Sequence, residues 1–136
     1  MRHTKILLIE DNRLLRWTMT KSLMQEGFLV IAPPTVEEGL QLGTAYPFDV
    51  LVSDWRLPDG HNGLEVLSRV RQAYPQIMSI LISAEADAAL TDRALDGGFD
   101  QVLQKPFEVS EMVGAIHACA PSVRRETIRY SCCDHG

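Results

Sequence analysis

Long apolar runs, an excess of basic charge and a cysteine framework are all missing from this chain of 136 residues. Its three cysteines (Cys119, Cys132 and Cys133) lie near the C-terminus, so disulfides cannot hold the body together. Reduced thiols and a cytoplasmic location are expected. The apolar residues 6–9 end at two acids, which is too short for a signal-peptide core or a membrane span. A formal net charge of −5 offers no electrostatic basis for binding nucleic acid or an anionic membrane.

The composition is otherwise that of an ordinary folded domain. Apolar residues make up 46% of the chain and charged residues 23%, close to the globular average, which excludes a disordered or collagen-like chain. The sequence contains no internal repeat and no low-complexity tract. This length suits one domain with a core of its own.

Five short apolar runs lie at residues 6–9, 28–31, 50–52, 80–82 and 102–103. They lack the polar alternation of a half-exposed strand, which is typical of strands covered on both faces. The runs therefore predict a parallel sheet.

Segments with helical periodicity alternate with these runs. In the first segment, Leu15, Met19 and Leu23 recur every four residues, which indicates a buried helix face. Strand and helix alternate five times, which predicts one open sheet with helices on both faces. The predicted helices span 13–26, 35–43, 62–74, 87–96 and 108–120, with capping residues at Thr35, at Asn62 or Gly63, and at Asp87.

Polar side chains follow four of the runs, at the point where each strand should end. Glu10 and Asp11 follow the first run, Asp54 the third, Ser83 the fourth and Lys105 the fifth. Because ligands of open α/β sheets bind beyond the carboxyl ends of the strands, we expect these side chains to meet at one edge.

Three carboxylates brought together need a raised pKa or a bound cation. Two such charges about 4 Å apart repel by about 4 kcal/mol at an effective dielectric of ~20. Hard oxygen ligands suit Mg²⁺, and a carboxylate beside Mg²⁺ can attack a phosphoryl group to form an aspartyl phosphate. Lys105 would neutralise one phosphoryl oxygen, and Ser83 would donate a hydrogen bond to another.

The combined pattern is IEDN at 9–12, SDWRLPDG at 53–60, Ser83-Ala84, and KPF at 105–107. In this order and at these separations, it resembles the receiver domain of two-component response regulators over nearly the whole chain. The resemblance implies an α/β, flavodoxin-like, doubly wound (βα)5 fold with a five-stranded parallel sheet in the order 2-1-3-4-5.

The resemblance also implies the chemistry. Asp54 would accept a phosphoryl group from a sensor histidine kinase or a histidine phosphotransfer protein, and Ser83 and Lys105 would hold the phosphoryl oxygens. The domain would catalyse only its own phosphotransfer and a slow loss of the phosphate, so it is not expected to be a conventional enzyme.

The same resemblance implies a Mg²⁺ site. Asp11 and Asp54 would bind the ion, Glu10 would act directly or through water, and the backbone carbonyl of Arg56 would be a further ligand.

The expected organisation is a receiver domain over residues 1–120 and a C-terminal tail or truncated linker over 121–136. The readout surface, meaning the surface that passes the signal to a partner, would be the fourth helix, fifth strand and fifth helix, roughly 87–118. A homodimer formed through this surface is one arrangement that stays open. Residues 121–136 are too few for an output domain, so the signal is expected to pass to a downstream protein or to an output domain in a longer regulator. Direct binding of nucleic acid or membrane by this chain is not expected.

Three features depart from the family pattern. Val102 stands where receivers usually carry an aromatic residue that moves with the switch. The turn at 58–63 is one residue longer than usual and is expected to be absorbed as surface loop. Arg56 and Glu85 flank the expected mouth of the site, and we hypothesise that they pair across it and slow hydrolysis of the phosphate.

Other interpretations remain open at this stage. Glu10 and Asp11 could cap the first helix. Trp17 falls off the buried stripe and is expected to be half exposed, and a role for it in docking a partner stays open. A metal site at Cys132-Cys133-Asp134-His135 is disfavoured. A degenerate receiver could serve as a constitutive protein-interaction module. An aspartate-nucleophile phosphatase would require Asp at position 56, where this chain has Arg. A nucleotide-binding protein or a flavodoxin would require a phosphate-binding loop at 10–12, where this chain has Glu-Asp-Asn. An enzyme on a similar sheet is therefore disfavoured.

Overall fold

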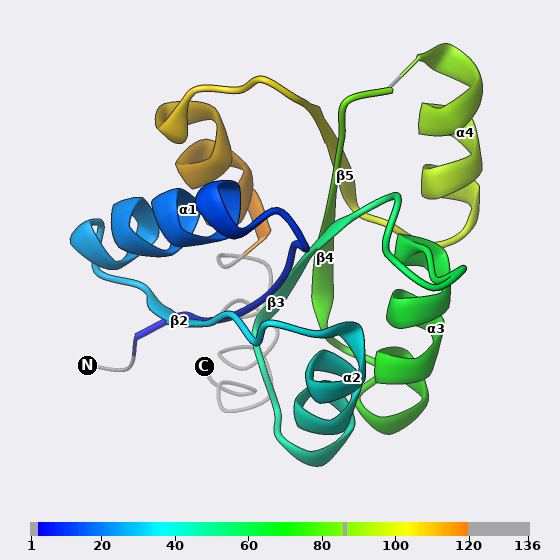
Figure 1. The fold of residues 1–136 in the computed structure, drawn as a ribbon, viewed down its shortest axis with the longest axis horizontal. Coiled ribbons are helices and arrows are strands. Elements are labelled where there is room, and N and C mark those ends of the chain that lie inside the picture. The colour runs from blue at the N-terminus through cyan, green and yellow to red at the C-terminus, as the bar shows by residue number, and fades with distance from the viewer. Residues whose placement is uncertain (1–2, 86, 120–136) are drawn as a thin grey trace, which may run out of the picture.

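The computed structural model describes residues 3–85 and 87–119, which form a single parallel sheet with helices on both sides (Figure 1). In chain order the elements are β1 (Lys5–Ile9), α1 (Arg13–Gln25), β2 (Leu29–Ile31), α2 (Val36–Ala45), β3 (Val50–Asp54), α3 (Gly63–Ala73), β4 (Met78–Ser83), α4 (Ala88–Asp96) and β5 (Gln101–Gln104). Residues 109–119 form a further helix after β5.

The strand order is β2-β1-β3-β4-β5, and every pair is parallel. This confirms the flavodoxin-like, doubly wound fold predicted from the sequence. The register pairs Ile9 with Ser53, Asp54 with Ile82, and Ser83 with Gln104. The residues that follow β1, β3, β4 and β5 therefore emerge at the same edge of the sheet.

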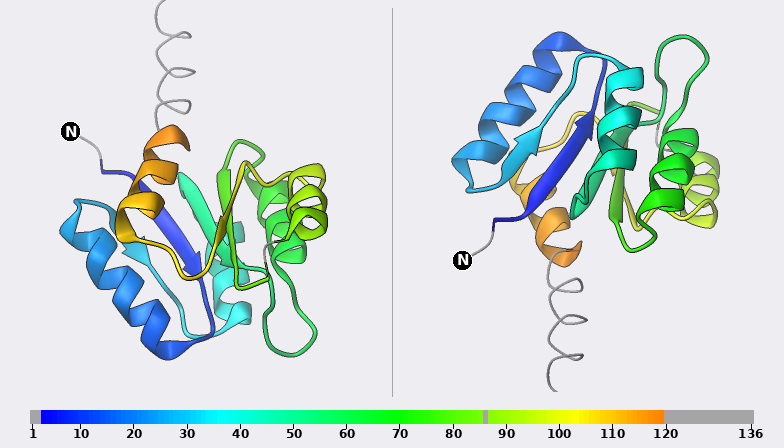
Figure 2. Two further views of the ribbon diagram at one scale, coloured as in Figure 1. Left: turned by 90° about the horizontal axis from the view of Figure 1, so that it is seen from above. Right: turned by 90° about the horizontal axis from the view of Figure 1, so that it is seen from below.

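Two apolar cores lie on opposite faces of the sheet, and Figures 1 and 2 show the helices that cover these faces. Alternate β1 residues point to opposite faces. Ile6 and Leu8 join the core under α1 and the 109–119 helix, whereas Leu7 and Ile9 join the core under α2 and α3. Because central strands are covered twice, their sequences read as continuous apolar runs.

Capping side chains begin the four helices that follow β1 to β4. Asn12, Thr35, Asn62 and Asp87 each accept a hydrogen bond from the backbone N–H three residues later. Thr35, Asn62 and Asp87 were predicted as caps, and these are confirmed. The N-cap of α1 is Asn12. Glu10 and Asp11 directly precede it at the positive end of the helix, and Glu10 Oε2 accepts a hydrogen bond from the Asn12 N–H, so the alternative that these acids support the start of α1 holds for Glu10.

The prediction that β2 is covered on both faces was wrong. Leu29 and Ile31 expose 48% and 46% of their surface, and Phe28, which was assigned to the strand, precedes it as a buried residue. The reason is topological, because β2 lies at the edge of the sheet while α2 packs against β1 and α3. An apolar run does not reveal whether its strand will be central.

The predicted tail at 121–136, with its Cys132-Cys133-Asp134-His135 sequence, lies outside the described residues. Within 3–85 and 87–119, no helix combines the length and the apolar character needed to cross a membrane.

Candidate functional site

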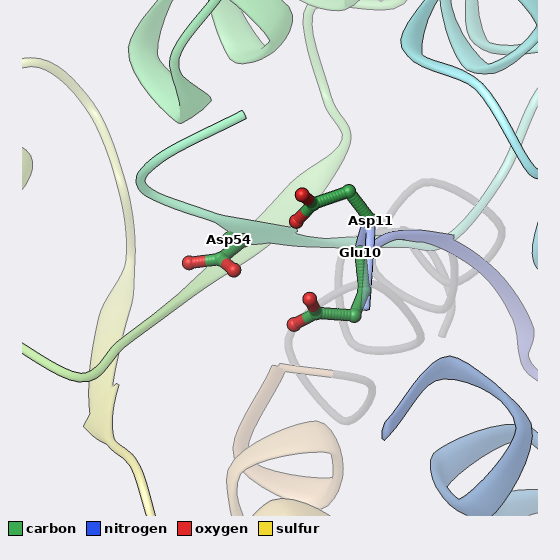
Figure 3. Close-up of side chains that lie close together, drawn as sticks. All are labelled: Glu10, Asp11 and Asp54. Carbon is green, nitrogen blue, oxygen red and sulfur yellow. The ribbon is translucent and has the colours of Figure 1, made fainter. Parts of the chain in front are cut away.

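Three carboxylates gather where β1 and β3 end (Figure 3). Glu10 and Asp11 directly follow β1, and Asp54 is the last residue of β3. One oxygen from each carboxylate lies within 4.8 Å of the others. Glu10 and Asp54 are buried, although 12% of the Asp54 side chain stays accessible, and Asp11 is exposed. The predicted convergence of these acids at one edge is therefore present.

An ammonium group contacts two of these acids. Lys105 directly follows β5, and its Nζ lies 2.8 Å from Asp54 Oδ2 and 2.8 Å from Glu10 Oε1. Burial alone lowers the pKa of Lys105, but the contacts with Asp54 and Glu10 outweigh it and leave the pKa above its ordinary value. Lys105 is therefore positively charged at neutral pH.

Glu10 is held by the start of α1. Its Oε2 accepts a hydrogen bond from the backbone N–H of Asn12 at 3.0 Å, and its carbonyl oxygen accepts one from Arg16 Nη1 at 3.1 Å. Burial raises the pKa of Glu10 above its ordinary value, and the contacts with Lys105 and Asn12 oppose this without cancelling it. These supports from Asn12 and Arg16 were missed, although Asn12 stands directly after the acid pair.

The main chain around Asp54 is fixed by close packing. Ser53 Oγ donates a hydrogen bond to the Asp54 carbonyl at 2.9 Å. Gly63 starts α3 against the same carbonyl, and a Cβ at this position would lie 2.7 Å from it. Only glycine allows this approach, so α3 begins tightly against the end of β3.

Ser83 ends β4 beside this cluster. It is buried, and its Oγ accepts a hydrogen bond from the backbone N–H of Glu85 at 3.0 Å. Its carbonyl accepts a hydrogen bond from the N–H of Lys105 at 2.8 Å, which joins it to the residue that contacts Asp54. The hydroxyl therefore lies at the predicted edge, and since its oxygen accepts the bond from Glu85, its hydrogen remains available to donate to another acceptor.

The donor set fits a hard divalent cation. Three carboxylates and one ammonium leave an excess of two negative charges at the edge. Glu10 Oε1 is buried and, among the described residues, accepts no hydrogen bond of good geometry despite its nearness to Lys105. Oxygen ligands and this charge suit Mg²⁺. Glu10, Asp11 and Asp54 are thus the residues here that could hold the ion.

The sequence profile of the response regulator receiver domain matches residues 6–117. The chain belongs to this family. Receivers are phosphoacceptor signalling domains of two-component systems rather than conventional enzymes, and they bind Mg²⁺ through acidic residues.

Two curated relatives of this receiver are the cell cycle transcriptional regulator CtrA of Caulobacter vibrioides and the cell cycle response regulator CtrA of Brucella ovis, 34% and 33% identical over 114 residues. The match covers 84% of this chain and 49% of each relative. The receiver therefore spans about half the length of these curated relatives.

Solved structures agree on the fold. A CheY-like receiver domain protein from Methanospirillum hungatei has a TM-score of 0.85 at 23% identity, over 92% of this chain and 99% of that one. A response regulator from Burkholderia pseudomallei, solved with a phosphorylated aspartic acid, a calcium ion and citrate, has a TM-score of 0.77 at 25% identity. That match covers 91% of this chain and 72% of the other.

Arg56 and Glu85 pair across the mouth of the receiver site, as hypothesised. Arg56 Nε donates to Glu85 Oε1 at 2.6 Å, and the two side chains are 77% and 53% exposed. Such exposed pairs contribute ~0.2–1 kcal/mol. The pair therefore contributes little to the stability of the fold, and its effect on hydrolysis stays a prediction. The carbonyl of Arg56 as a metal ligand stays a prediction.

The longer turn at 58–63 is absorbed as surface loop, as expected. Its exposed tip places Asp59 and Gly60 at φ values of +60° and +78°, in the left-handed region. The N–H of Leu57 bonds to the carbonyl of His61, which closes the loop above the start of α3.

His61 links this loop to two helices of the receiver. Its Nδ1 lies 3.1 Å from Glu65 Oε1 on α3, and its Nε2 lies 3.5 Å from Glu37 Oε2 on α2. The hydrogen bond with Glu65 is the main cause that raises the pKa of His61 above its ordinary value. Partial burial lowers it, and the charges of Glu65 and Glu37 add to the rise.

Replacing His61 with Gln should therefore cost stability in a pH-dependent way. Because the folded pKa is raised, the contribution of His61 is fully present below about pH 6.5, the unfolded value, and is lost as pH rises through the folded pKa. In urea unfolding experiments, the free energies of unfolding of wild type and His61→Gln should differ more in acid than well above neutral pH. A difference that grows with pH would contradict the ion pairs. Glu37→Gln should reproduce part of the effect.

Proposed function

We propose that this receiver accepts a phosphoryl group on Asp54 from a sensor histidine kinase or a histidine phosphotransfer protein, in a Mg²⁺-dependent reaction. The observation that carries the proposal is the position of Lys105 Nζ, which lies 2.8 Å from Asp54 and 2.8 Å from Glu10 of the acidic cluster. A partly accessible carboxylate beside an ammonium and two further acids is arranged to receive an anion together with a cation.

The transfer balances without any further reactant. A carboxylate oxygen of Asp54 attacks phosphorus, the P–N bond of the donor phosphohistidine breaks, and the histidine nitrogen keeps the electron pair. Lys105 stays in place and neutralises a phosphoryl oxygen, and Ser83 Oγ–H donates to another. Both groups stabilise charge that develops during transfer.

Mg²⁺ would be held by Glu10, Asp11, Asp54 and the carbonyl of Arg56. When bound, it would neutralise phosphoryl charge and orient the oxygens of the donor. The phosphorylated aspartic acid and calcium ion in the Burkholderia pseudomallei regulator support this assignment by similarity.

The surface around α1 supports a protein donor. α1 starts directly beyond the acidic edge, and its outer face exposes Leu14 and Trp17 at 74% and 61%. Trp17, expected to be half exposed, thus belongs to an apolar surface near the site. A protein that presents phosphohistidine must cover the rim, and exposed apolar side chains beside it favour such contact.

The output stays a proposal as well. One curated relative is named a transcriptional regulator. We propose that this receiver likewise signals to an output domain or a downstream protein, through the surface formed by α4, β5 and the 109–119 helix. A homodimer through this surface is one arrangement. A cytoplasmic location and a receiver domain over 1–120 remain predictions.

The test is direct phosphorylation with acetyl phosphate, a small donor that needs no kinase. With Mg²⁺, the intact chain should gain the mass of one phosphoryl group, and peptide mapping after borohydride reduction should place it on Asp54. No gain with Mg²⁺, or a gain on another residue, would refute the assignment.

A degenerate receiver that acts only as an interaction module is the second candidate. Val102, which replaces the usual aromatic residue, is the observation that favours it. Trp55 lies next to Asp54, so its fluorescence should change during a Mg²⁺ titration if the site is functional. A chain that binds neither Mg²⁺ nor acetyl phosphate would favour the second candidate.

Arg56→Ala should shorten the lifetime of the phosphorylated receiver. The pair with Glu85 screens the mouth from attacking water, and its loss should speed hydrolysis by up to about fivefold, on the scale of ~1 kcal/mol. The measurement is the decay of the acyl phosphate after donor removal. Arg69→Ala, which removes an exposed arginine on α3, is the matched control. An unchanged or longer lifetime in Arg56→Ala would eliminate the screening role.

A further inference from the structure

Trp55 is joined to the phosphoacceptor position by its main chain. It directly follows Asp54, its N–H donates to the carbonyl of Ile82 at 3.0 Å, and its carbonyl accepts from the N–H of Gly63 at 2.9 Å. The side chain is partly buried and packs against the core under α2 and α3. A change in the main chain at Asp54 therefore reaches the indole through a single peptide unit.

The indole contacts α4 through one side chain. The guanidinium carbon of Arg93, in the last turn of α4, lies 5.1 Å from the centre of the Trp55 ring. This is a cation–π contact, worth ~0.5–1 kcal/mol at an exposed site. It joins the residue after the phosphoacceptor position to the helix in the predicted readout surface.

α4 is otherwise lightly attached. Of its nine residues, only Leu90 and Ala94 are buried. An open cavity of about 640 Å³ is lined by Leu90 and Arg93 of α4, together with Trp55 and Gln104. Few buried apolar contacts make an element prone to local opening. The contact with Trp55 therefore adds to a small number of contacts that hold α4.

The usual route from the site to this surface is missing. Val102 of β5 stands at the expected aromatic position, and it is partly buried against the core that also contacts Trp55. Valine is short and stiff at χ1, so it cannot make the large side-chain movement of an aromatic residue. Trp55 packs against the same core as Val102 and also contacts α4 through Arg93.

We propose that the Trp55–Arg93 contact couples the position of α4 to the phosphorylation of Asp54, in place of the missing aromatic residue. The proposal rests on the proposed phosphoacceptor function. A phosphoryl group on Asp54 adds charge and three acceptor oxygens one residue before Trp55. The main chain at residues 54 and 55 shifts in response, and this shift displaces the Trp55 ring that Arg93 contacts. By linkage, whatever loosens this contact weakens the coupling in both directions.

Hydrogen exchange of the α4 amides (88–96) tests the proposal in the full chain. Without phosphate, Arg93→Ala should speed their exchange about two- to fivefold, since the contact contributes ~0.5–1 kcal/mol. With acetyl phosphate and Mg²⁺, the exchange rate of the α4 amides should change in the wild type. At the same extent of Asp54 phosphorylation, Arg93→Ala should show less than half of that change. Arg93→Lys should restore part of it, whereas the control Arg69→Ala should match wild type.

Fluorescence gives a second measurement. Trp17→Phe leaves Trp55 as the single tryptophan, and its emission should respond to phosphorylation less in Trp17→Phe/Arg93→Ala than in Trp17→Phe alone. Should Arg93→Ala fold poorly, Trp55→Leu tests the same contact from the ring side by exchange.

The outcomes separate the two proposals. A wild-type chain that gains no phosphoryl group refutes the proposed function, as mass measurement would show. A phosphorylated chain whose α4 does not respond, or whose Arg93→Ala variant responds as fully as wild type, overturns the coupling and leaves the phosphoacceptor role intact.

Discussion

Asp54→Asn should abolish phosphorylation by acetyl phosphate while leaving the fold intact. The amide is not a nucleophile toward phosphorus at neutral pH, so the signal should fall to background. The fold should persist because Asn has the shape of Asp and Lys105 keeps its contact with Glu10. The measurement pairs the mass gain of the intact chain with its circular dichroism spectrum.

Asp59→Asn is the matched control, because it makes the same chemical change on the exposed loop. Its residue has a φ of +60°, which Asn tolerates well, so this variant should take up phosphate as wild type does. Phosphate uptake by Asp54→Asn at the level of this control would show that another residue is the acceptor.

The site was predictable because its residues follow strand ends in the sequence. Glu10 directly follows an apolar run, Asp54 and Lys105 each come two residues after one, and parallel strands bring such positions to one edge. No knowledge of side-chain packing was needed, since topology alone brings these residues together.

Contacts between side chains of segments far apart in the sequence or on different elements were not predictable in the same way. Arg93 lies on the exposed side of α4, and nothing in its sequence neighbourhood marks Trp55 as its partner. The links from His61 to Glu37 and Glu65 were missed for the same reason, because they depend on how α2 and α3 are placed around a loop. The Arg56–Glu85 pair was predicted only because both residues sit beside motif positions.

Burial of an apolar strand was the other limit. β2 and the central strands have similar apolar composition, yet Leu29 and Ile31 are half exposed because the chain order places β2 at the edge. Apolar composition predicts that a strand forms, whereas its place in the sheet decides how much of it is covered.

Asp11→Asn should weaken Mg²⁺ binding by at least tenfold. Asp11 supplies the most accessible carboxylate of the cluster, and the other two acids already share the charge of Lys105. Two unit charges about 4 Å apart interact by about 4 kcal/mol at an effective dielectric of ~20, which is an upper limit, and a loss of ~1.4 kcal/mol already gives a factor of ten.

The affinity is measured by Mg²⁺ titration of Trp55 fluorescence in the Trp17→Phe background, and by acetyl phosphate uptake at limiting Mg²⁺. Asp92→Asn on the exposed face of α4 is the control for loss of a surface charge, and it should bind Mg²⁺ as the parent does. Excess Mg²⁺ should restore uptake in Asp11→Asn, because the nucleophile and Lys105 are unchanged. If Asp11→Asn binds Mg²⁺ as tightly as Asp92→Asn, the acidic cluster is not the metal site, and the excess charge at this edge serves another purpose.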